Sequence, residues 1–151
     1  MSAQAKIHPA TPSPAYEADG YGWAMAQAAL LKQRKFDAVD WDNVIEEIES
    51  VGASEYRVVE SALRLVLLHH LKWEKQAHKR SRSWQVSIKT HLRRFDRELG
   101  RNPGLRASLP QIMVDAYADA RDDAAVETGI DIDTFPVDPP SWDEIRATRE
   151  L

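Results

Sequence analysis

The 151-residue sequence contains no cysteine, which excludes disulfide bonds, thiolate metal sites and cysteine nucleophiles. It also lacks a Gly-x-Ser-x-Gly nucleophile elbow and a glycine-rich phosphate loop. Three serines that could be considered as nucleophiles, Ser81, Ser83 and Ser141, stand where helix N-caps are expected. The sequence therefore does not support nucleophilic catalysis. Whether the protein is an enzyme stays open, with a preference against it, and no cofactor is predicted.

Long apolar runs and a secretion signal are lacking as well. The most apolar stretch, residues 63–73, is interrupted by Arg64 and Lys72 and is shorter than the ~20 apolar residues of a transmembrane helix. Residues 1–15 hold Lys6 as their only charged residue and no continuous apolar segment, unlike a secretory signal. The sequence thus predicts a cytoplasmic protein without a membrane partner, present as a monomer or a homodimer.

The composition, with 43% hydrophobic and 29% charged residues, is typical of one globular domain. Its centre is predicted around residues 63–73. One helical face follows the i, i+3, i+4, i+7 spacing: Val59, Ala62, Leu63, Val66, His70 and Trp73. Leucines on both flanks widen the apolar sector beyond what a surface helix needs: Leu65, Leu67, Leu68 and Leu71. We therefore predict a buried central helix over residues 55–77.

The other elements follow from the same periodicity and from cap residues. Residues 1–15 are expected to form a flexible leader, and residues 16–151 one domain. Further helices are predicted over 18–34, from 41 to a break or bend at Gly52, from about 83 to 99, and over 110–127. The Asp- and Pro-rich residues 130–140 are expected to wrap around the bundle before a short last helix that starts at a Ser141–Glu144 capping box. The prediction is an all-α, single-domain helical bundle of about five main helices around a buried central helix, without β-sheet.

The net charge of −4 conceals a separation of charge along the chain. Residues 72–106 contain eleven Lys and Arg against three acids, a balance of +8. Residues 115–151 contain eleven acids against three Arg, a balance of −8. Charge blocks on helices are usually solvated or paired with one another. We expect the basic and the acidic helix to lie side by side and to compensate each other.

The favoured functional hypothesis uses the basic segment. Lys89, Arg93 and Arg97 recur at helical spacing and form a ridge. Arg80 and Arg82 precede them at a helix start, where free N–H groups and basic side chains converge. These five residues are the predicted binding residues of a small interaction protein, whose partner would be another protein or an acidic ligand.

An alternative hypothesis is a metal-binding or metal-dependent helical bundle that uses Glu46, Glu49 and His69. Carboxylates three residues apart lie near one face of a helix, and a neighbouring helix could bring a histidine to them. Such bundles normally use a Glu-x-x-His motif, which this sequence lacks. The competing interpretation is a structural histidine hydrogen-bonded to a carboxylate, in which case no metal is expected.

A second alternative is nucleic-acid binding through residues 72–106, where cations are interleaved with Trp73, Trp84 and Phe95. Against it, these aromatic residues lie on the inner stripes of their predicted helices and are expected in the core, as are Trp23 and Trp41. The isoelectric point of about 5.7 is also low for a nucleic-acid-binding protein. Nucleic acid is therefore not the expected partner.

Several short sequence motifs follow one another along the chain. They are Trp23 with Gln27-Ala28 and Leu30-Leu31, residues 46–50, residues 69–73, residues 80–84, and residues 127–129 with 133–136. From Tyr16 to Ile145 the chain resembles the bacterial family catalogued as domain of unknown function 29. The resemblance implies a helical fold and no established activity, so it supplies no catalytic residues. His69, not His70, occupies the family's histidine position four residues before the tryptophan, which favours His69 if a site exists.

Overall fold

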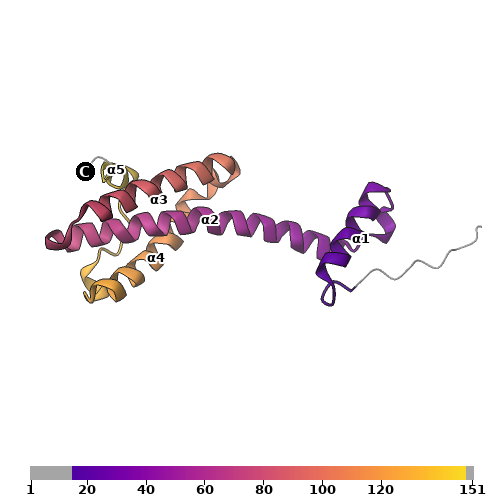
Figure 1. Ribbon diagram of the computed structural model, residues 1–151, viewed down its shortest axis with the longest axis horizontal. Helices are drawn as coiled ribbons and strands as arrows, with labels where there is room; N and C mark the ends of the chain where they lie inside the picture. The colour runs from indigo at the N-terminus through magenta and orange to yellow at the C-terminus, as the bar shows by residue number, and fades with distance from the viewer. Residues whose placement is uncertain (1–14, 149–151) are drawn as a thin grey trace, which may run out of the picture. The chain divides into compact units, whose positions relative to one another are not determined.

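The computed structural model describes residues 15–148, and this part of the chain is built of helices without a strand. Figure 1 shows its five α-helices: α1 (Gly20–Lys32), α2 (Trp41–Lys75), α3 (Arg82–Arg101), α4 (Leu109–Thr128) and α5 (Trp142–Ala147). None of the helices in the described part combines the length and the apolarity that crossing a membrane requires. The all-α fold predicted from the sequence is confirmed.

The described part of the chain divides into two compact units between Val51 and Gly52, and α2 contains residues of both. The predicted helix break at Gly52 is wrong, because α2 is continuous from Trp41 to Lys75. A glycine inside a helix costs only about 1 kcal/mol relative to alanine. The neighbouring Ala53 and Glu55 are good helix formers, so a single glycine does not end the helix.

The first unit is held together at the junction of α1 with the start of α2. Asp19 caps α1, because its side chain accepts a hydrogen bond of 2.8 Å from the Gly22 backbone N–H. The buried Trp23 donates from Nε1 to Asp40 Oδ2 at 3.0 Å. The buried Gln27 accepts at Oε1 a hydrogen bond of 2.8 Å from the Asp40 backbone N–H. Asp40, which directly precedes α2, is thereby bonded to α1 through two side chains.

The apolar stripe at the start of α2 does not enter a core, so the prediction of a buried Trp41 is wrong. The exposed fractions are 46% for Trp41, 50% for Ile45 and 66% for Ile48. The reason lies in the small size of the packing partner. Within the 13 residues of α1, the buried side chains are Trp23 and Gln27. They contact Asp40, just before α2. The other large apolar side chains of α1 and of the residues after it, such as Tyr21, Met25 and Phe36, are themselves exposed.

In the second unit, α3 and α4 lie along the C-terminal part of α2 (Figure 1). α3 is antiparallel to α2, because Asn102 after its end contacts Glu55, whereas His91 nearer its start stacks on His69. α4 is parallel to α2, as three contacts show: Tyr56–Asp115, Arg64–Asp123 and Lys72–Glu127. The second unit is therefore an up-down-up bundle of three helices joined by short connections.

The core of the second unit surrounds α2, as predicted from the apolar sector of its sequence. The α2 residues with no exposed surface are Val59, Ala62, Leu63, Val66 and Leu67. On α4, Ala116, Ala120 and Ala124 are also fully buried. Small residues on one helical ridge permit a close approach of two helices. The chain then returns from α4 across the bundle, where Phe135 and Ile145 add to the same core.

Replacing glycine by alanine is expected to have opposite effects on stability at two positions, Gly129 and Gly52. Gly129 follows α4 with a φ of 71°, so Gly129→Ala is expected to lower the free energy of unfolding by about 1–2 kcal/mol. Gly52 lies inside α2 with nothing within 4 Å of an added Cβ, so Gly52→Ala is expected to raise it by about 0.5–1 kcal/mol. Urea denaturation followed by circular dichroism measures both variants. If both substitutions raised the free energy of unfolding, or both lowered it, the explanation from the backbone conformation at the two glycines would be contradicted.

Candidate functional site

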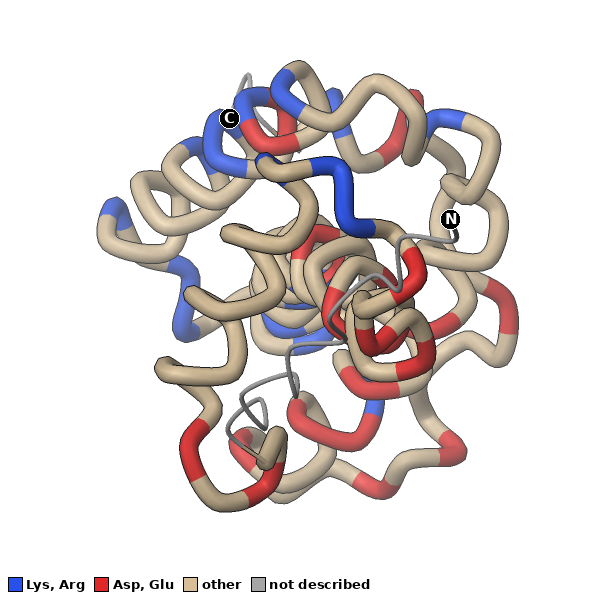
Figure 2. The backbone as a smooth tube through the Cα atoms, turned by 90° about the vertical axis from the view of Figure 1, so that its right-hand side faces the viewer, with Lys and Arg blue, Asp and Glu red and all other residues tan. Residues whose placement is uncertain are grey.

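α3 carries a row of the predicted binding residues on one flank, beside its buried face. Its inner side chains are buried: Ile88, Leu92, Phe95 and Leu99. At about 100° of rotation per residue, Arg82, Lys89 and Arg93 fall within about 40° of one another, on a flank about 110° from the middle of the buried stripe. Arg82 and Arg93 are exposed, and Lys89 is half-buried. Figure 2, with Lys and Arg in blue and Asp and Glu in red, shows the two signs of charge gathered along different parts of the chain.

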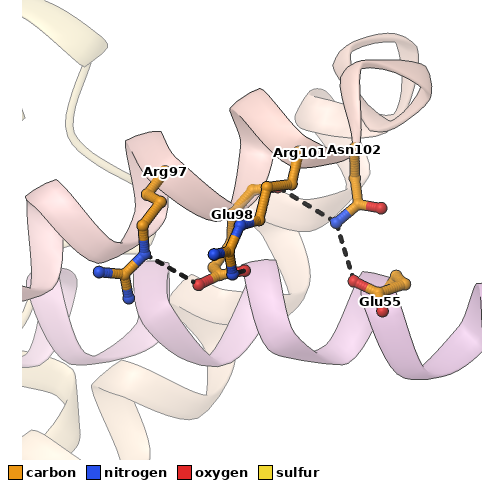
Figure 3. Close-up of polar contacts among 5 residues, drawn as sticks. All are labelled: Glu55, Arg97, Glu98, Arg101 and Asn102. Carbon is orange, nitrogen blue, oxygen red and sulfur yellow. Dashed lines mark hydrogen bonds and ion pairs between the residues drawn. The ribbon is translucent and has the colours of Figure 1, made fainter.

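The C-terminal end of α3 carries further cations, but these contact a carboxylate (Figure 3). Arg97 donates from Nε to Glu98 Oε1 at 3.2 Å, and Arg101 from Nη1 to Glu98 Oε2 at 3.4 Å. The hydrogen bond from Arg97, together with the charges of both arginines, lowers the pKa of Glu98. Asn102 donates to Glu55 Oε2 at 2.8 Å and joins this group to α2. The charge of the predicted binding residue Arg97 is thus partly compensated.

Arg80, also predicted as a binding residue, contacts the end of α2. Its Nε donates to the Trp73 carbonyl oxygen at 2.9 Å. Its guanidinium carbon lies 4.9 Å from the centroid of the Trp73 ring, a cation–π distance. Both contacts hold the turn between α2 and α3. Arg80 therefore positions the start of α3, where Arg82 is the first helical residue.

The acidic residues of α4 pair with α2 and not with α3. Arg64 contacts Asp119 at 3.4 Å and Asp123 at 2.7 Å. Lys72 Nζ lies 2.7 Å from Glu127 Oε2. No ion pair joins α3 to α4 within residues 15–148. The predicted compensation between the basic and the acidic segment is therefore found for Lys72, which lies in α2, and is wrong for the cations of α3.

The other predicted group, Glu46, Glu49 and His69, is divided between the two units. Glu46 and Glu49 are exposed residues of α2 in the first unit, and His69 belongs to the second. His69 stacks on His91 with 5.9 Å between the ring centroids, and burial lowers the pKa of both imidazoles. Among residues 15–148 no group of three or more His, Cys, Asp or Glu side chains is placed to hold a metal ion. A joint site of these three residues stays a prediction.

A cavity of about 440 Å³ in the second unit was not predicted from the sequence. It lies between the C-terminal end of α2, residues 136–140 and α5. His70 lines it, although the sequence had favoured the neighbouring His69. The other titratable lining residues are Glu74, Lys75, Tyr117, Asp138 and Glu144. The one local signal was the cluster of prolines before the last helix, because prolines can form a rigid wall.

The comparisons with known proteins identify a family and no characterised relative. No curated protein and no solved structure matches the chain. The family described as "Domain of unknown function DUF29" matches residues 15–147, which is nearly the whole chain. The match agrees with the range over which the sequence strings resemble that family. The chain belongs to the DUF29 family.

Proposed function

We propose that the protein acts by binding, and that the exposed basic face of α3 contacts an acidic segment of a partner protein. The residues assigned to the contact are Arg82, Lys89 and Arg93. Arg97 lies at the edge of this face and shares its charge with Glu98. Arg80 holds the preceding turn through its contacts with Trp73.

One observation supports this proposal above the others, which is that the face has no acidic partner of its own. Within residues 15–148, Arg82, Lys89 and Arg93 form no ion pair. Three acids of α4, Asp119, Asp123 and Glu127, contact Arg64 and Lys72 instead. A row of uncompensated cations creates a positive potential that attracts and orients an oppositely charged surface.

The surroundings of the face favour a protein partner over a nucleic acid. Single-stranded nucleic acid is bound by cations together with aromatic side chains on which bases can stack. Trp73 and Phe95 are buried, with 8% and 1% of their surface exposed. Trp84 is half-buried, and Lys72 Nζ lies 5.1 Å from its ring centroid. Trp73 and Phe95 are therefore not available to stack on bases, and the ring of Trp84 already contacts Lys72.

Charge reversal on the face is expected to weaken binding to an acidic polypeptide. We would measure the retention of the protein on immobilised poly-L-glutamate against salt concentration. Arg82→Glu combined with Arg93→Glu is expected to weaken the interaction about tenfold or more, because two favourable charge contacts become repulsive. Both positions are exposed and unpaired within the described residues, so circular dichroism should show unchanged helix content.

A matched control separates the local effect from the change in net charge. Lys35→Glu combined with Arg57→Glu changes the net charge by the same amount at exposed positions outside α3. Equal weakening by both double variants would contradict a specific role of α3. Tighter, Arg93-dependent binding to single-stranded DNA than to poly-L-glutamate would instead support the nucleic-acid alternative.

A further inference from the structure

The cavity at the C-terminal end of α2 is separate from the basic face of α3. We infer that it is a binding site for a small organic cation, in which an ammonium or amidinium group is carried on an apolar body. Its volume of about 440 Å³ lies within the range of about 300–1,000 Å³ that is usual for small-molecule sites. The side chains that line the cavity indicate which class of ligand it would bind.

His70 is a buried polar residue, and its Nδ1 has no hydrogen-bond partner among residues 15–148. It is 7% exposed and lines the cavity. Burial lowers the pKa of His70, so the imidazole is neutral at pH 7. A neutral imidazole has one nitrogen that accepts a hydrogen bond. Nδ1 is enclosed by protein atoms, so a ligand in the cavity can form a hydrogen bond to His70 only at the other ring nitrogen, Nε2.

The hydroxyl groups that line the cavity already donate their protons in hydrogen bonds to backbone carbonyl oxygens. Tyr117 donates from its hydroxyl to the Pro136 carbonyl oxygen at 2.7 Å. Thr148 donates from Oγ1 to the Ile145 carbonyl oxygen. A hydroxyl whose proton is engaged can only accept a further hydrogen bond. These two side chains therefore suit a ligand that brings its own donors.

The charged groups of the lining are mainly carboxylates. Glu74, Asp138 and Glu144 line the cavity together with one cation, Lys75. Glu144 is fixed in place, because its Oε2 accepts hydrogen bonds from the Ser141 backbone N–H at 2.7 Å and from the Ser141 hydroxyl at 2.8 Å. The negative charges of Glu74 and Glu144 act on His70 and raise its pKa against the effect of burial. Three carboxylates against one ammonium group favour a positively charged ligand.

The rest of the wall is apolar and rigid. Leu71, Ala147, Pro136, Pro139 and Pro140 line the cavity. Proline rings have a fixed φ, so this side of the cavity is preorganised and loses little conformational entropy when a ligand binds. The apolar wall suits a hydrocarbon or aromatic body, and the carboxylates suit the cationic head of the same molecule.

The test uses three probes of nearly equal size that differ in charge: benzamidine, benzamide and benzoate. Isothermal titration calorimetry with the full chain at pH 7 measures their affinities. Benzamidine is expected to bind with a dissociation constant of about 1 mM or tighter, as suits so small a ligand. Benzamide should bind more weakly and benzoate not detectably. Benzoate binding as tightly as benzamidine, or no binding of benzamidine, would overturn the inference.

Two double variants test whether benzamidine binds in this cavity. Glu74→Gln combined with Asp138→Asn removes two exposed carboxylates of the lining and should weaken benzamidine binding about tenfold or more, as the loss of a charged hydrogen bond does. Glu49→Gln combined with Asp122→Asn is the matched control, since it removes two exposed carboxylates outside the cavity. Unchanged affinity in the first variant, or equal loss in both, would refute a site in this cavity. Neither result depends on binding at the basic face of α3.

Discussion

Replacing Phe135 by alanine is expected to lower the free energy of unfolding by about 3–5 kcal/mol, the range for removing a buried phenylalanine ring. Phe135 lies outside the α-helices, in the segment that follows α4. It is nevertheless 1% exposed and packs in the core of the second unit. The cost combines the lost transfer of an aromatic ring from water with the cavity that the truncated side chain leaves.

Removing the Phe135 ring should also hold the segment that crosses the bundle after α4 less firmly in place. Arg121 donates from Nη2 to the carbonyl oxygens of Ile132 at 3.0 Å and of Phe135 at 3.3 Å. The Tyr117 hydroxyl binds the next carbonyl oxygen, that of Pro136. These hydrogen bonds depend on a backbone position that the buried ring fixes. The segment forms one wall of the cavity, so benzamidine binding should weaken together with stability.

Urea denaturation monitored by circular dichroism measures the effect of Phe135→Ala. Val137→Ala is the control in the same segment, because Val137 is 78% exposed, and it is expected to change stability by no more than about 0.5 kcal/mol. Similar, small effects of both substitutions would show that the ring of Phe135 does not anchor the segment. A large effect of Val137→Ala would place the anchor elsewhere in residues 130–140.

Local sequence rules predicted the helices of the second unit well, because those helices are specified by local signals. Apolar residues at helical spacing placed α3 and α4 within about two residues of their observed ends, the accuracy that helix boundaries allow. The capping box of Ser141 and Glu144 starts α5 as predicted. The apolar sector of α2 was expected in the core, and Leu63 and Leu67 are fully buried.

The same rules failed where the outcome depends on surrounding structure. Gly52 was predicted to end a helix, but a single glycine is a weak signal, and α2 continues through it. Trp41 was predicted inside because it lies on an apolar stripe. A stripe is buried only if a second element covers it, and α1 contacts the chain through Trp23 and Gln27. Periodicity shows which residues share a face but not whether that face is covered.

The candidate sites show the same limit. The basic residues of α3 were visible in the sequence, and the helical period placed Arg82, Lys89 and Arg93 on one face. The sequence did not show that the acids of α4 leave these cations unpaired, because the choice of α2 as the partner of α4 is set by packing. The cavity was even less predictable. It joins His70 of α2 to Glu144 of α5, and only the path of the intervening segment brings them together.

Trp23→Ala is expected to open the first unit locally while the second unit stays folded. Among residues 15–51 the buried side chains are Trp23, Gln27 and Val39, so one ring supplies most of the buried apolar surface there. Truncation of a buried tryptophan costs about 3–5 kcal/mol. So small a core cannot absorb that loss by repacking, and its opening does not remove a residue from the core around Phe135.

The ring of Trp23 has two further roles that the alanine variant removes. Its Nε1 donates to Asp40 Oδ2 at 3.0 Å, and Tyr16 packs edge-on against it with 4.8 Å between the ring centroids. Trp23→Phe is the matched control, because phenylalanine keeps a buried ring but loses the hydrogen bond. It should cost about 1 kcal/mol, the usual net contribution of one hydrogen bond.

Hydrogen exchange read by mass spectrometry distinguishes the expected local opening from global unfolding. In Trp23→Ala, the amides of α1 should exchange at least about a hundredfold faster, which corresponds to roughly 3 kcal/mol of lost protection at 1.4 kcal/mol per factor of ten. The amides of α3 and α4 should keep their rates, because their core does not include Trp23. Faster exchange in α3 and α4 to the same degree would mean that the two units unfold together, and that Trp23 stabilises the whole chain.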